Sequence, residues 1–198
     1  MIETIFTVNS PCTRPSVAPY CERVKAQVGA KRFEHIVRVA ILTETIAKAN
    51  NFSDDEVRAA SLAAILHDAA RDLSAEEIFR LAPPLTELER ANPMSVHGRA
   101  GRRLVESWGI SDERILDAVE GHVFGVSKDN RIGMAVYIAD VSEPGRGVNE
   151  DIRELAMKNL YRAYKRAVDS KVQYLRAKGK AIHPDTLRVH RELSAELS

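Results

Sequence analysis

The pair His67-Asp68 ends an apolar segment, AAILHDAARD, and both of its side chains are able to bind a metal ion. Neighbouring residues of a helix point about 100° apart, so adjacent ligands can approach one ion from two sides. The carboxylate has two oxygens and can also bridge two ions, and both residue types suit divalent iron, manganese, zinc or nickel. Taken alone, a His-Asp dipeptide is better explained as the polar C-terminal end of a helix.

Further histidines and aspartates stand on the apolar stripes of other predicted helices and not on their polar faces. They are His35, His97, His122 and Asp140. Any single one of them is more simply explained as a core polar residue with a hydrogen-bond partner. Together with the first pair they favour a shared cation, because buried carboxylates need a compensating charge.

The elements that must position these residues are helices. From about residue 20 onward the apolar spacing is helical almost everywhere, and the alternation typical of strands is absent. We predict an all-α fold with a single domain of seven to nine helices over residues 31–198, preceded by an extension over 1–30 whose first 19 residues are loose or strand-like. The predicted helices include 53–67, 74–81, 95–108, 111–124, 130–141, 149–178 and 183–197.

Composition excludes several classes of function. The 198 residues carry 29 basic and 28 acidic side chains, so nothing global indicates a nucleic-acid partner or a membrane surface. No apolar run approaches the roughly 20 residues that span a bilayer, and the N-terminus does not resemble a secretory signal. With only Cys12 and Cys21 available, a disulfide framework and a thiolate metal site both fit poorly, and a cytoplasmic location is expected.

The ordered set of histidines and aspartates resembles the HD-domain superfamily of metal phosphohydrolases in its dinuclear form. The flanking residues are similar to those of the bacterial YqeK-like branch, and this resemblance covers about residues 31–190. The segments that carry it are Lys31–His35, Leu66–Leu73, Val96–Gly98, Ala139-Asp140 with Glu143–Arg146, and Gly179–Leu187.

This resemblance implies a symmetrical tetraphosphatase that splits diadenosine tetraphosphate into two ADP by metal-activated water. It implies one or two divalent ions per chain, with iron expected and manganese, nickel, zinc or magnesium as alternatives. One ion would be held by His35, His67, Asp68 and Asp140. Asp68 would bridge to a second ion, with His97 and His122 completing that site or touching substrate phosphate, so that Asp68, His97 and His122 are the expected catalytic residues. The expected substrate contacts are Arg32, Arg71, Val123 and Arg146.

The segment after the fourth histidine departs from the family pattern, because Val123-Phe124 replaces the usual pair of threonines. Two hydroxyls that could bind phosphate are therefore missing, while the six metal-binding candidates are intact. Two alternatives stay open on this account: another HD phosphohydrolase acting on nucleotide monophosphates or other phosphoesters, and a non-catalytic sensor of nucleotide or metal. Retention of all six candidates speaks against the sensor.

Several other residues are given structural roles. His183 precedes a proline at the start of a helix and is predicted to cap it. Tyr161, Tyr164 and Tyr174 are expected to pack the long helix against the domain. Trp108 is expected in the core or in the contact of a homodimer, to which the long helix could also contribute.

Overall fold

The computed structural model describes residues 10–195, which fold into eleven α-helices joined by turns, with no strand among them. The all-α prediction is therefore confirmed for this part of the chain. None of its helices combines the length and the hydropathy needed to cross a membrane. The helices are α1 Ala18–Gln27, α2 Ala30–Ala49, α3 Asp54–Leu66, α4 Ala75–Leu81, α5 Glu87–Ala91, α6 His97–Ser107, α7 Glu113–Gly121, α8 Arg131–Ser142, α9 Glu150–Ala156, α10 Leu160–Ala177 and α11 Pro184–Ser194.

The number of helices exceeds the predicted seven to nine partly because the predicted helix over 149–178 is interrupted. Asn50, at the end of α2, occupies the interruption between α9 and α10. Its side-chain amide donates to the carbonyl of Ala156 at 2.8 Å, and its oxygen accepts from the amide of Leu160 at 2.9 Å. The Asn159 side chain also accepts from a backbone amide of α10. Both broken helix ends thus find partners, which an unbroken apolar period cannot reveal.

Helix starts follow the capping signals of the sequence. Ser53 and Ser74 each accept a hydrogen bond from the backbone of a glutamate three residues later, and Glu56 and Glu77 return bonds to the serine amides. These reciprocal bonds satisfy amides that have no partner within the helix. They fix where α3 and α4 begin.

The described part of the N-terminal segment is helical and crosslinked. Residues 11–13 form a 3-10 turn that leads into α1, and a disulfide joins Cys12 and Cys21, whose Cα atoms are 5.7 Å apart. The expectations of no disulfide and of a loose leader are therefore wrong over residues 10–19, whereas residues 1–9 lie outside the described part. The turn before α1 reverses the chain and brings the two cysteines to bonding distance, and Arg14 beside it pairs with Glu44 of α2.

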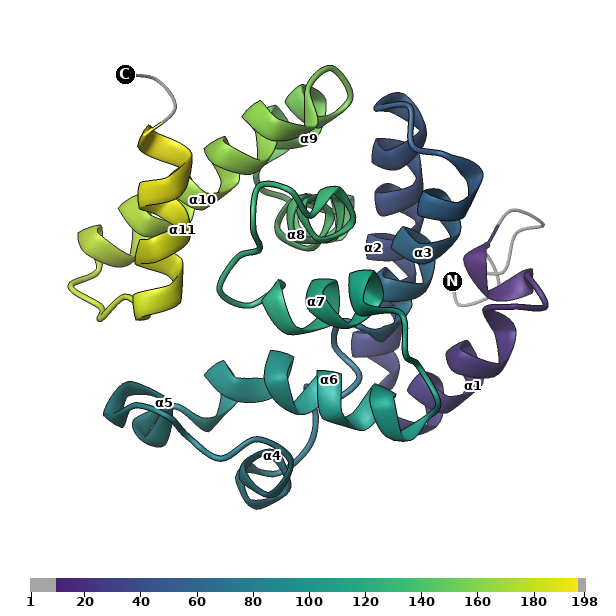
Figure 1. Cartoon of the computed structure of the whole chain (residues 1–198), viewed down its shortest axis with the longest axis horizontal. Helices are drawn as coiled ribbons and strands as arrows, with labels where there is room; N and C mark the ends of the chain where they lie inside the picture. The colour runs from purple at the N-terminus through teal and green to yellow at the C-terminus, as the bar shows by residue number, and fades with distance from the viewer. Residues whose placement is uncertain (1–9, 196–198) are drawn as a thin grey trace.

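The centre of the molecule is α8, which Figure 1 shows surrounded by α2, α3, α7 and α10. Residues 132–139 of α8 are all buried, so this helix has no polar face. A helix that is apolar all round belongs inside a fold. Its last turn brings Asp140 among the ends of the neighbouring helices.

Candidate metal centre

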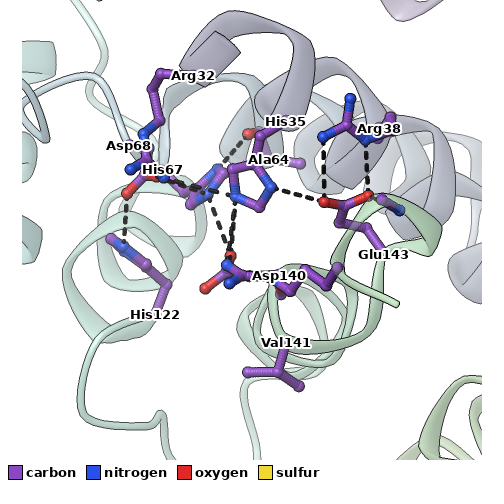
Figure 2. A network of polar contacts seen from close by, with 12 residues as sticks. Arg32, His35, Arg38, Ala64, His67, Asp68, His122, Asp140, Val141 and Glu143 are labelled. Carbon is purple, nitrogen blue, oxygen red and sulfur yellow. Dashed lines mark hydrogen bonds and ion pairs between the residues drawn. The ribbon is translucent and has the colours of Figure 1, made fainter. Parts of the chain in front are cut away.

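Six histidine and aspartate side chains from five helices and their ends converge at one place, and Figure 2 shows five of them. Apart from Asp140, none is more than 8% exposed. The C-terminal end of α3 is capped by His67, and Asp68 follows it directly. The others are His35 in α2, His97 at the start of α6, His122 at the end of α7 and Asp140 in α8.

Their ligand atoms form two groups. One consists of His35, His67 and Asp140, and the other consists of Asp68, His97 and His122; within each group the atoms lie within 4.8 Å of one another. Asp68 joins the groups, because Oδ1 lies 3.1 Å from Nε2 of His97 while Oδ2 lies 3.7 Å from Nε2 of His67. The carboxylate of Asp68 therefore faces one group with Oδ1 and the other with Oδ2.

Three of the four imidazoles are held in the same way, by a backbone carbonyl three residues earlier in the chain. A backbone carbonyl can only accept, so Nδ1–H must donate in the three histidines whose Nδ1 lies at 2.5–2.7 Å from such an oxygen. These bonds run from His67 to Ala64, from His97 to Met94 and from His122 to Val119. In each ring Nε2 is left with its lone pair directed into the cluster, the form in which imidazole binds metals.

The resulting lone pairs are not matched by donors. Nε2 of His67 is fully buried and has no hydrogen-bond partner. Nε2 of His97 and Nε2 of His122 face each other at 2.9 Å, although both Nδ1 atoms already donate elsewhere. Two ligands at right angles on one ion, each about 2.1 Å from it, would be about 3 Å apart. The donor set and its spacing thus fit divalent cations.

Outside the ligand groups, Glu143 orients His35. Its Oε1 accepts from Nδ1 of His35 at 3.1 Å, and Arg38 holds the same carboxylate through two bonds, at 2.8 and 3.3 Å. Figure 2 shows this chain of contacts. A carboxylate behind a histidine fixes its ring and raises its basicity as a ligand. The sequence reasoning assigned no role to Glu143 or Arg38, and only the position of Glu143 one turn after Asp140 could have suggested one.

The electrostatics of the cluster keep the carboxylates charged and one histidine neutral. Burial alone would raise the pKa of Asp68, but the neighbouring His67 and the contacts with the imidazoles of His122 and His97 hold it well below its usual value. Burial would likewise raise the pKa of Asp140, but the hydrogen bond with His35 helps to hold this pKa below its usual value. Burial lowers the pKa of His67 to about 4, so this imidazole is neutral near pH 7.

A cleft of about 780 Å³ opens onto the cluster, and four cationic side chains line it. Arg32 donates to Oδ2 of Asp68 at 2.8 Å, and Arg146 donates to Oδ1 of Asp140 at 2.5 Å. Arg71 contacts the sulfur of Met94. Lys171 of α10 donates to the carbonyl of Val123, and burial lowers the pKa of this lysine to about 8.

The four residues predicted to contact substrate, Arg32, Arg71, Val123 and Arg146, therefore all line one cleft with the cluster. Lys171 was missed, because it lies in a charged stretch that reads as a solvated face. Tyr174 lines the cleft and is 56% exposed, so the expectation that it packs α10 against the domain is wrong. Tyr164, in contrast, is fully buried against the core, as expected.

Outside the cluster, His183 caps α11 by accepting from the amide of Asp185, as predicted. Its Nε2 also meets the buried carboxylate of Glu89 at 3.0 Å, and Phe124 stacks on its ring. Trp108 is partly buried against the main core.

The fold and this cluster define a class of protein. The profile of the HD domain matches residues 32–145, which is more than half of the chain, and the chain therefore belongs to the HD-domain family of hydrolases. The match begins at Arg32 and ends just beyond Glu143, so it contains all six clustered residues.

Three bacterial proteins of known name are similar to this chain in sequence. The symmetrical bis(5'-nucleosyl)-tetraphosphatase of Bacillus subtilis is 33% identical over 82% of this chain and 89% of its own length. The enzyme of that name from Staphylococcus aureus is 28% identical over 73% of this chain and 79% of its own. A Mycoplasma genitalium protein named "Probable nicotinate-nucleotide adenylyltransferase/Ap4A hydrolase" is 31% identical over 71% of this chain, but the match spans only 42% of that longer protein.

A solved structure from Clostridium acetobutylicum shares the fold. It is described as a predicted HD superfamily hydrolase involved in NAD metabolism, and it superposes with a TM-score of 0.81 at 27% identity. The similarity covers 90% of this chain and 97% of the other, so it extends to the helices beyond the HD profile.

Proposed function

We propose that this protein is a metal-dependent phosphohydrolase that splits diadenosine tetraphosphate symmetrically into two ADP. The observation that carries the proposal is the position of Asp68, whose two oxygens address two groups of ligand atoms at the base of a cationic cleft. The names of the relatives support the choice of substrate. On this proposal residues 31–198 are the hydrolase domain and residues 1–30 are its extension.

Metal binding is assigned residue by residue. His35, His67, Asp140 and Oδ2 of Asp68 would hold one divalent ion. Oδ1 of Asp68, His97 and His122 would hold a second ion or contact the substrate phosphate. A divalent cation, for which iron is the expectation, supplies Lewis-acid chemistry there by activating water and offsetting charge on phosphoryl oxygens.

The arginines of the cleft are assigned to the polyphosphate chain. Arg32 uses one nitrogen on Asp68, and Arg146 uses two on Asp140, one on its carboxylate and one on its backbone carbonyl. These bonds fix each guanidinium while leaving other N–H groups for phosphate oxygens. Arg71 adds a third cation on the same cleft. A tetraphosphate carries several negative charges at neutral pH, so a row of fixed cations both attracts it and sets its register.

One observation keeps a second candidate, hydrolysis of a different phosphoester. Val123 presents an apolar side chain to the cleft where the family usually has threonine. Phe124 stacks on His183 with ring centroids 3.7 Å apart, and its carbonyl accepts from Thr186. Neither side chain offers a hydroxyl to phosphate, so a substrate with fewer phosphates would lose less binding here than a tetraphosphate.

The test is incubation of the metal-loaded protein with diadenosine tetraphosphate, followed by chromatographic separation of the products. ADP as the sole product supports the proposal. Formation of ATP with AMP, or activity on mononucleotides only, would contradict it, and retention of nucleotide without turnover would favour a sensor.

Asp68→Ala is the matched variant for this assay. It removes the carboxylate that contacts both groups of ligand atoms, so we expect metal content and activity to fall together, by more than the roughly 10–100-fold typical of outer ligands. Asp151→Ala, which removes an exposed carboxylate paired with Arg166, is the control and should change neither. A fully active Asp68→Ala protein would overturn the assignment.

A further inference from the structure

Two apolar side chains at the rim of the cleft are exposed without covering any core. Among residues 10–195, the exposed large hydrophobic side chains are Ile41, Leu85, Val148 and Tyr174. Two of these four, Val148 and Tyr174, line the same cleft as the ligand groups, and each is 56% exposed. Exposed apolar groups that gather at a binding cleft indicate a ligand surface more often than scattered ones do.

One face of α10 forms a wall of the cleft, and the side chains along it change in character from the base of the cleft to its rim. Ala167, Ser170, Lys171 and Tyr174 all line it, with the spacing i, i+3, i+4 and i+7 of a single helical face. Lys171 bonds to the carbonyl of Val123, the residue after His122, and so lies deep in the cleft. Tyr174 follows about one turn later, roughly 4.5 Å along the axis, and is exposed. A cation near the ligand groups is thus followed outward by an aromatic ring.

The position of Val148 is fixed by the backbone on both sides of it. Gly147 and Asn149 both have left-handed backbone conformations, with φ of 67° and 61°. This conformation is uncommon for a residue with a side chain and persists where the surroundings hold it. Here the side-chain amide of Asn149 donates to the carbonyl of Val141 at 2.8 Å, just after Asp140. Val148 is therefore held at the rim by contacts to the helix that carries a ligand residue.

We propose that Tyr174 and Val148 form a nucleobase subsite, and that Lys171 binds a phosphate between this subsite and the ligand groups. The inference rests on the proposed function for the class of ligand, a nucleoside polyphosphate. Every base has a π-face that can stack on an aromatic ring, and an aliphatic side chain can cover part of it. The order of aromatic ring, cation and metal ligands from rim to base matches the order of base and phosphates in a nucleotide.

The test is calorimetric titration of the manganese-loaded protein with ADP and, separately, with inorganic pyrophosphate. In Tyr174→Ala we expect ADP to bind about 5- to 150-fold more weakly, the range for loss of one base–aromatic stack, while pyrophosphate binding stays within twofold. Tyr174→Phe keeps the ring and should keep the ADP affinity. Lys171→Met should weaken both ligands.

Leu85→Ala is the matched control, because it removes an exposed apolar side chain that does not line the cleft. It should leave both affinities unchanged. Wild-type affinity for ADP in Tyr174→Ala would overturn the subsite, as would absence of ADP binding to the wild-type protein or equal weakening of pyrophosphate. A dimer that dissociates in Tyr174→Ala, with ADP affinity unchanged, would instead identify the pair as a contact between two copies.

The titration separates this inference from the proposed function. Ring-dependent binding of ADP without hydrolysis of diadenosine tetraphosphate would support the subsite and contradict the proposed activity. Hydrolysis with an ADP affinity that does not depend on Tyr174 would support the activity and overturn the subsite.

Discussion

Within residues 10–195, two groups of buried histidines and carboxylates differ in how their donors and acceptors are matched. Apart from the metal cluster, there is the Glu89 network, which consists of Glu89 in α5, Arg99 in α6 and His183 before α11. The Glu89 carboxylate is fully buried and accepts from the Leu85 amide, from two nitrogens of Arg99 and from Nε2 of His183. Every oxygen of this carboxylate thus meets a donor.

The metal cluster has the opposite character. Nε2 of His67 has no partner, and the Nε2 atoms of His97 and His122 face each other at 2.9 Å although Nδ1 of each ring already donates to a backbone carbonyl. Burial of unmatched polar atoms is costly, so the cluster is complete only with cations, whereas the Glu89 network is complete with protein atoms alone. The matching of donors with acceptors, more than the residue types, therefore distinguishes the metal site from the structural ion pair.

The largest expected effect on stability comes from the Glu89 network. Glu89→Ala leaves the Arg99 guanidinium without its carboxylate, and breaking a buried pair in this way costs about 3–5 kcal/mol of unfolding free energy. Metal content should stay at the wild-type value, since no ligand is touched. Urea unfolding and elemental analysis check the two statements. Metal loss as large as in Asp68→Ala would show that the two groups are not independent.

A smaller effect is expected from pH on the metal-stripped protein. The unfolded chain protonates His67 near pH 6.5, whereas burial lowers its pKa in the folded protein to about 4. The unfolded state therefore binds more protons at His67 between these values. The contribution of His67 to the free energy of unfolding is fully present above pH 6.5 and falls by about 3 kcal/mol as the pH drops to 4.

Urea unfolding of the chelated protein between pH 4 and pH 7 measures this loss. His67→Gln has no titrating ring and should show a flatter dependence over the same window. An identical slope in the two proteins would mean that His67 is not held neutral by the fold. Burial also lowers the pKa of His97, so part of the slope should persist in the variant.

The smallest effect is expected at the carboxylate behind His35. Glu143→Gln keeps the size of the side chain but removes the charge that orients the ring, and metal affinity should fall roughly 10–100-fold. Competition with a chromophoric chelator measures the affinity. Glu34→Gln is the control, because Glu34 approaches Arg38 only at 4.0 Å and does not contact His35. Equal affinities in Glu143→Gln and Glu34→Gln would remove Glu143 from the site.

The sequence predicted the all-α fold and the six residues of the cluster because both depend on local periodicity. His35 and Asp140 stand on apolar stripes, so helix packing had to bring them inside. Pairings across the chain were not predictable in this way: Glu143 reaches His35 over 108 positions, and neither residue type marks its partner. Tyr174 was misplaced for a related reason, since an amphipathic period does not say which edge of its face ends in a cleft.

The contacts of Asn50 have a mechanical consequence. This one amide joins the end of α2, which carries His35, to the start of α10, which carries Lys171 and Tyr174. Helices α2 and α10, which both contribute side chains to the cleft, are therefore joined at the end of α2 and the start of α10. Any widening of the cleft to admit a ligand must occur at the far end of α10, where Tyr174 lies.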